Sequence, residues 1–214
     1  FYGWQVLYSP NFLVDAEDRY FIIQRGDSFK DVQDNLYDGR YINELVSFCF
    51  LSKLMDYDTQ VKAGRFLLKK DMTNLEAIRL LRSGQQAPVN ITFNNIRLTE
   101  EIADKITQNI LLTPEEFNLA LTDYLATNDE GWDEENIIGM FIPNTYEVYF
   151  DVSGEALILR MNREYHNFWN EERIARADSI GLTPREVSVL ASIVQAESVK
   201  ADEGAKIAGL YMNR

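Results

Sequence analysis

One carboxylate in this sequence is placed where it could act as an acid. The segment 183–198 reads TPREVSVLASIVQAES, and its first residues, Thr183-Pro184 with Glu186, are typical of a helix start. Apolar residues then follow at helical spacing, namely Val187, Leu190, Ala191 and Val194. Glu197 lies three residues after Val194, on the same face of the predicted helix. Burial disfavours a charged carboxylate, so this position predicts a raised pKa, as a general acid requires.

A second interpretation of the same pattern gives Glu197 no catalytic role. The helix could end near Gln195, so that Glu197 simply leaves the core for solvent. Other chemistries have weaker support, because Cys49 lies in the apolar run FCFL and His166 is the only histidine. Since no Cys/His cluster exists, the sequence predicts neither a metal site nor a cofactor.

The composition narrows the classes of partner. The formal net charge is −13, from 34 acidic against 21 basic residues. A negatively charged surface repels phosphate groups, so binding of nucleic acid is disfavoured. Hydrophobic residues make up 46% of the chain, enough for a folded core, and no apolar stretch approaches the ~20 residues that span a bilayer. Because the chain opens without an initiator methionine, we expect a membrane anchor or signal upstream of residue 1.

The first part of the sequence predicts a small strand-helix-helix-strand unit. Alternation and turn residues indicate a strand at 20–23, a helix capped by Ser28, a second helix at 41–55, a strand at 65–69 and a helix at 73–84. The second part predicts a strand at 89–93 and helices at 102–110, from 114, at 157–168, at 171–179 and at 184–197. Between these helices, 128–136 is predicted as a solvated loop and 137–150 as two short extended pieces. We therefore expect an α+β protein with domains at 1–89 and 90–214.

Several segments resemble one known family. ASIVQAES and KIAGLYMNR near the end of the sequence, together with IPNTYEVYF at 142–150, are similar to the endolytic murein transglycosylases, the YceG-like (MltG) family. YFIIQRGDSFKDV at 20–32 resembles the opening of a LysM-like module, and KAGRFLL at 62–68 fits its closing strand. The resemblance implies a LysM-like N-terminal unit with a preceding juxtamembrane segment, followed by a mixed, helix-rich part of a transglycosylase catalytic domain.

The resemblance also implies an activity. Family members cut peptidoglycan glycan strands between MurNAc and GlcNAc, leave anhydro-MurNAc ends and need no cofactor or metal. The family commonly has Glu-x-Glu where this chain has Gln195 and Glu197, so Glu197 is the one candidate for the catalytic acid. The implied place is the cell envelope, as an extracytoplasmic (periplasmic) part anchored in the inner membrane, with cell-wall synthesis proteins as possible partners.

Four further residues are candidates for contacts with sugar. Amide and aromatic groups suit saccharides, which points to Asn144 and Tyr146, and Ser198 and Asn213 lie in the matched motifs; the alternative for Tyr146 is a core position. Family members continue past Asn213-Arg214, so we expect residues 1–214 to fold but to cleave poorly by themselves.

Other aromatic residues and the overall function also have alternatives. Trp132 and Trp169 are predicted to be packing or loop residues, and His166 a surface residue. The alternative function is a non-catalytic peptidoglycan-binding or scaffolding protein of the envelope.

Overall fold

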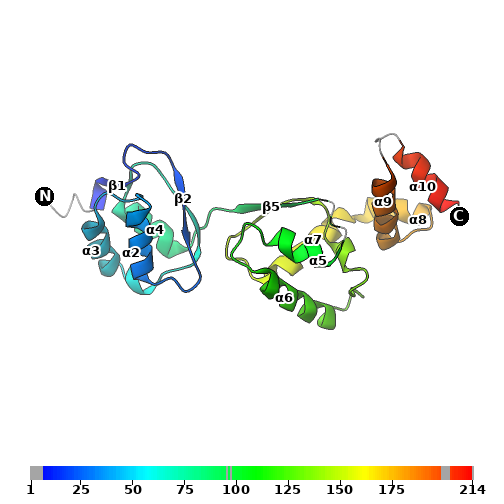
Figure 1. Ribbon diagram of the computed structural model, residues 1–214, viewed down its shortest axis with the longest axis horizontal. Helices are drawn as coiled ribbons and strands as arrows, with labels where there is room; N and C mark the ends of the chain where they lie inside the picture. Colours follow the sequence, from blue (N-terminus) through cyan, green and yellow to red (C-terminus); the bar gives the residue numbers. More distant parts are fainter. Residues whose placement is uncertain (1–6, 95, 97, 199–202, 214) are drawn as a thin grey trace. The chain divides into compact units, whose positions relative to one another are not determined.

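A computed structural model describes residues 7–94, 96, 98–198 and 203–213. The chain is built from helices and small two-stranded sheets and forms two compact units, so the predicted α+β class is confirmed (Figure 1). The first unit takes the described part of Phe1–Ile91 with Thr107–Thr113 and Thr145–Ser153. The second takes the described parts of Thr92–Ile106, Pro114–Asn144 and Gly154–Arg214. Among the described residues, no helix is both long enough and apolar enough to cross a membrane.

The first unit has the predicted order of strand, helix, helix and strand. Its elements are β2 (Arg19–Ile23), α2 (Phe29–Asp38), α3 (Leu45–Leu54), the short 3-10 helix η1 (Tyr57–Thr59), β3 (Gly64–Leu68) and α4 (Asn74–Ser83). Strands β2 and β3 pair antiparallel, from Arg19 opposite Leu68 to Ile23 opposite Gly64. A second antiparallel pair, β1 (Pro10–Phe12) with β4 (Met72–Thr73), was not predicted, because two- and three-residue strands are too short to show alternation.

Local sequence signals set where these helices begin. Ser28 and Asp31 form a reciprocal capping box at the start of α2, and Thr73 and Glu76 form another at α4. Helix α4 ends at Gly84, whose φ of 75° lies in the left-handed region that glycine tolerates. The apolar faces of these elements meet in one core, with Cys49 packed at its edge; its largest fully buried members include Phe12, Leu36, Phe48, Tyr57, Phe66, Leu68, Ile78 and Leu81.

Two buried asparagines join the start of the chain to two helix starts. The Asn11 amide nitrogen donates to the Glu44 carbonyl (2.8 Å) and to Asn74 Oδ1 (2.7 Å), and Asn11 Oδ1 accepts from the Glu44 backbone N–H (2.8 Å). Asn74 in turn donates to Ser47 Oγ at 3.0 Å. These hydrogen bonds therefore link β1 to the beginnings of α3 and α4.

Helix α3 also carries an apolar stripe that faces solvent. Val46, Phe50 and Leu54 follow one another at four-residue steps and are 76%, 64% and 69% exposed. The other side of the helix supplies Phe48 and Leu51 to the core. Helix α3 is thus apolar on two faces, of which the described residues cover one.

The second part of the chain is mostly helical. Its elements are β5 (Val89–Phe93), α5 (Glu100–Ile106), α6 (Pro114–Thr127), the 3-10 helix η2 (Ile137–Met140), β6 (Asn144–Val148), α7 (Gly154–Phe168), α8 (Glu171–Ser179), α9 (Pro184–Glu197) and α10 (Gly204–Met212). Strand β5 pairs with β6. Helices α6 and α7 pack closely, because a Cβ at Gly154 would lie 2.7 Å from the Cβ of Ala120, so only glycine fits there.

One prediction for this part was wrong and another is confirmed. Residues 137–150 hold one strand rather than two extended pieces, because 137–140 form the 3-10 helix η2 and bury Ile137 and Met140. The stretch 128–136 is a largely exposed loop, as predicted, and Trp132 within it is a packing residue that is only 3% exposed. Its indole edge meets the ring of Tyr165 on α7, with centroids 4.9 Å apart, so one aromatic residue draws an otherwise acidic segment onto the core.

Candidate active site

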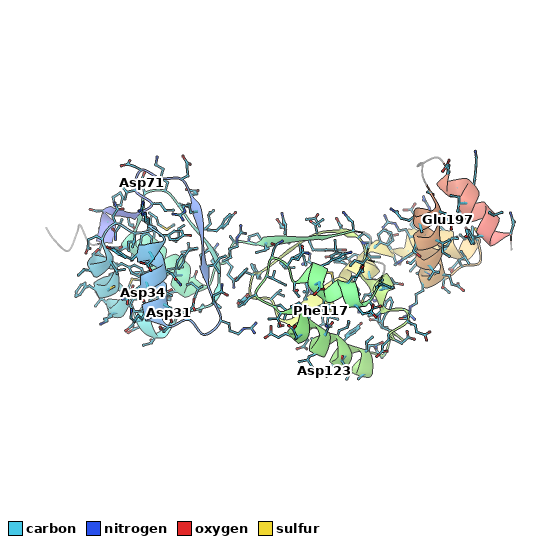
Figure 2. The ribbon with its side chains drawn as sticks, in the orientation of Figure 1. Asp31, Asp34, Asp71, Phe117, Asp123 and Glu197 are labelled. Atoms are coloured by element: carbon cyan, nitrogen blue, oxygen red, sulfur yellow. The ribbon has the colours of Figure 1, made fainter. Side chains whose placement is uncertain are left out.

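The helix that carries the candidate acid forms as predicted. Thr183 Oγ1 accepts from the Glu186 backbone N–H, the Glu186 carboxylate accepts from the Thr183 N–H at 2.7 Å, and Pro184 occupies the first turn. These hydrogen bonds hold the pKa of the Glu186 carboxyl below its usual range. Helix α9 then continues to Glu197, its last residue, rather than ending near Gln195 (Figure 2). Glu197 is nevertheless exposed to solvent, as the alternative interpretation expected.

The predicted burial of the α9 stripe is not found. Within the described chain α9 has no buried residue, and Glu197 is exposed. Val187, Leu190 and Val194 are partly covered and Ala191 is exposed, because the neighbours of α9 are α8, α10 and η2, which leave one face of the helix open. The desolvation expected at Glu197 is therefore not supplied by the described residues.

Ser198 and Asn213 lie on the same pair of helices as Glu197. Ser198 is the C-cap of α9, and its backbone N–H donates to the Val194 carbonyl at 2.9 Å. The Ser198 Oγ is buried and has no hydrogen-bond partner among the described residues. Asn213 is exposed and caps α10, which packs against α9. Three of the five predicted site residues thus belong to one helical hairpin.

The other two candidates lie on β6. Asn144 is its exposed first residue, where a side chain can meet a ligand. Tyr146 is 4% exposed, which favours the alternative interpretation of a core residue over a contact with sugar. Tyr146 belongs to the first compact unit, whereas Asn144, Glu197, Ser198 and Asn213 belong to the second.

Sequence reasoning missed a polar cluster around Glu130. The Glu130 carboxylate accepts from Asn162 Nδ2 at 2.7 Å, and its other oxygen lies 2.9 Å from His166 Nε2. Burial raises the pKa of Glu130, but the hydrogen bonds from Asn162 and His166 outweigh it, so the pKa lies below its usual range. The available signal was the spacing of Asn162 and His166, four residues apart on one face of a predicted helix.

Arg185, the second residue of α9, reaches the same loop. Its guanidinium donates to the backbone carbonyls of Glu130 (2.6 Å) and Gly131 (2.9 Å) and lies 4.2 Å above the centre of the Trp132 ring. The start of α9 is therefore fastened to the 128–136 loop by two hydrogen bonds and a cation–π contact.

Among the described residues, no group of three or more His, Cys, Asp or Glu side chains is arranged to hold a metal ion. The groups that the site offers are one exposed carboxylate at the end of α9, a nearby hydroxyl and an amide. These can exchange a proton and hydrogen-bond to a polar ligand.

Known proteins of one family are similar to this chain over most of its length. Two curated relatives, both called endolytic murein transglycosylase and both from Streptococcus pneumoniae (serotype 2 strain D39 and strain R6), are 23% identical over 248 residues. The alignment covers 100% of this chain but 44% of each relative, so the chain spans less than half of their length. A crystal structure of a YceG-like protein from Listeria monocytogenes is 22% identical with a TM-score of 0.41, covering 88% of this chain and 67% of that one. The model of the YceG-like family matches residues 21–214, and the chain belongs to that family.

Proposed function

We propose that this protein cuts peptidoglycan glycan strands as an endolytic lytic transglycosylase, with Glu197 as its catalytic acid and base. The observation that carries the proposal is the match of residues 21–214 to the YceG-like family, together with Glu197 at the end of α9. The relatives that align with the whole chain bear the name endolytic murein transglycosylase. Peptidoglycan is accordingly the proposed substrate and the cell envelope the proposed location.

In the proposed reaction one carboxyl group serves twice. Glu197 protonates the oxygen that leaves the MurNAc unit, and the bond from that oxygen to the anomeric carbon breaks. The resulting carboxylate then takes the proton of that sugar's own hydroxyl, whose oxygen bonds to the anomeric carbon and closes an anhydro ring. No water is consumed, which distinguishes the reaction from the hydrolysis catalysed by carboxylate pairs.

The groups near Glu197 suit the handling of a sugar. Exposed Asn213 and Asn144 are proposed hydrogen-bond partners for saccharide hydroxyl or amide groups. Ser198 is a further proposed partner, but its Oγ is buried among the described residues and would have to become exposed to reach a sugar. The strand-helix-helix-strand unit is proposed to be LysM-like and to bind or orient the glycan. Attachment to the membrane ahead of residue 1, an extracytoplasmic location and contacts with cell-wall synthesis proteins remain predictions.

A second candidate function is a non-catalytic peptidoglycan-binding or scaffolding protein. The observation that favours it is the exposure of Glu197, because a solvated carboxylate lacks the burial that usually adapts a general acid. The two functions differ in one measurable respect, since only the enzyme releases new glycan ends.

The test compares the wild type with Glu197→Gln in the complete protein. Purified glycan strands are incubated with each protein, and the products are analysed by mass spectrometry. We expect anhydro-ended fragments from the wild type and a loss of at least ~10²-fold in Glu197→Gln, the usual scale for a positioned general acid. Glu172→Gln is the matched control, because Glu172 is an exposed carboxylate that only pairs with Arg176 on the same helix.

Each outcome separates the candidates. Near-wild-type cleavage by Glu197→Gln would remove this residue from the mechanism, and we expect Gln195→Glu not to rescue the variant. Binding of glycan without release of ends by the wild type would instead support the scaffolding function. Products that carry an added water would identify a hydrolase.

A further inference from the structure

The contacts of Arg185 fasten α9 at its base. Two hydrogen bonds to the carbonyls of Glu130 and Gly131 and the stack on Trp132 are all made by one side chain in the first turn of the helix. We call this group of four residues the Arg185 anchor. A guanidinium can make this set because its donors are planar and paired, which a lysine cannot reproduce.

The loop that Arg185 contacts is itself fixed by hydrogen bonds and by packing against α7. Asn128 Oδ1 accepts from the Trp132 N–H at 2.9 Å and Asn128 Nδ2 donates to the Trp132 carbonyl at 2.9 Å, which closes the loop around the indole. The indole itself packs edge-on against Tyr165 of α7. Because the Glu130 side chain is bound to Asn162 of the same helix, the anchor connects α9 to a loop fixed on α7.

Apolar packing does little to fix the direction of α9. None of its residues is buried in the described chain. Where it faces α8, a depression of about 250 Å³ remains, lined by Phe168, Trp169, Arg173, Arg176, Ala177, Ile180 and Val187. The orientation of the helix therefore depends strongly on the contacts at its first turn.

Because Glu197 lies far along α9 from the Arg185 anchor, a small change in the orientation of the helix moves the acid by a large distance. Glu197 lies twelve residues after Arg185 in the same helix, about 18 Å along the axis at ~1.5 Å per residue. A tilt of about 5° at the base would move the end of the helix by roughly 1.5 Å, and a misplacement of ~1 Å can cost ~10²-fold in rate. We infer that Arg185 is a positioning residue that aims Glu197 at the glycosidic oxygen, an inference that rests on the proposed function.

The experiment measures kcat and KM for Arg185→Ala and Arg185→Lys in the complete protein, on purified glycan strands. We expect kcat to fall by about 10- to 100-fold in Arg185→Ala with a smaller rise in KM, because the acid is misplaced while Asn144 on β6 does not move with α9. Arg185→Lys keeps the charge but not the paired donors, so its kcat should also fall. Wild-type kcat in both variants would overturn the inference.

Arg173→Ala is the matched control. Arg173 lies 4.3 Å from the centre of the Phe168 ring and donates to the Phe168 carbonyl at 2.6 Å, the same combination of contacts, but with a partner outside α9. Its loss should leave kcat unchanged. An equal fall in Arg173→Ala would mean that the loss in the Arg185 variants is a general effect on the fold, which contradicts a positioning role.

A second comparison tests whether Arg185 acts through Glu197. In the Glu197→Gln background there is no acid left to aim, so adding Arg185→Ala should lower the residual rate by less than about twofold. A further fall as large as in the wild-type background would show that Arg185 serves substrate or fold directly, which overturns the inference. Absence of cleavage by the wild type would refute the proposed function instead.

Amide hydrogen exchange tests the anchor without any activity measurement. Arg185→Ala should raise exchange in peptides from α9 while those from α7 keep their protection, because the anchor holds α9 and not the interior of the unit. Unchanged exchange in α9 would show that the helix is held by other contacts and would overturn the inference.

Discussion

Replacing Asn11 by alanine should destabilise the first unit far more than a surface asparagine would. The substitution removes the two donors and one acceptor that bind the Glu44 backbone and Asn74. An unsatisfied buried polar group costs about 1–3 kcal/mol, and at least the Glu44 N–H and Asn74 Oδ1 lose the Asn11 partner. Allowing for water that enters the space left by the side chain, we expect a loss of about 2–4 kcal/mol in the free energy of unfolding.

Hydrogen exchange resolved by peptide is the suitable assay, because the protein has two units and one melting curve would mix them. Protected amides of the β2–β3 ladder should exchange about 30- to 1,000-fold faster in Asn11→Ala, which is the expected loss converted at ~1.36 kcal/mol per tenfold. Peptides from α7 should be unchanged. Asn35→Ala, at an exposed position of α2, is the control and should change exchange by less than about threefold.

The partner residue provides a further check. A double-mutant cycle of Asn11→Ala with Asn74→Ala should show strong coupling, since each removes the other's partner. Exchange in the ladder that stays within threefold of wild type in Asn11→Ala would refute the view that these hydrogen bonds hold β1 to α3 and α4.

Two smaller predictions concern the second unit. Thr183→Ala removes the cap of α9 and should cost about 1 kcal/mol, seen as faster exchange in its first turn, whereas Thr183→Ser should retain the cap; equal exchange in both variants would contradict the role of the cap. Because the folded-state pKa of Glu130 is lowered, its contribution to stability is present above its unfolded pKa of about 4.3 and is lost as pH falls through the lower folded pKa. Denaturation of the wild type and Glu130→Gln between pH 7 and pH 3 should therefore show a difference that shrinks at acid pH, and a constant difference would contradict this assignment.

Local sequence signals predicted the helices well. The boxes at Ser28, Thr73 and Thr183 and the glycine at 84 act within a few residues, so they can be recognised without tertiary information. The pairing of β1 with β4 could not be recognised, because the strands are too short to show alternation and the contact between Asn11 and Asn74 joins residues far apart in the sequence.

The candidate site was predicted less fully. Periodicity correctly extended α9 to Glu197 but cannot say which other elements cover its stripe, and the described residues leave it partly open. Trp132 was predicted to be a packing or loop residue, but its partner Tyr165 lies more than thirty residues away and could not be identified from the sequence. The roles of Glu197, Asn144, Ser198 and Asn213, and the domain boundary at 89/90, remain predictions.

The exposed stripe on α3 has a consequence for the behaviour of the protein in solution. Val46, Phe50 and Leu54 attract any apolar surface, while the net charge of −13 keeps identical chains apart. Salt changes the balance, since the screening length falls from about 10 Å at 0.1 M to about 3 Å at 1 M, whereas apolar attraction is not screened. We therefore expect the charge to oppose self-association through this stripe, and concentrated salt to favour it.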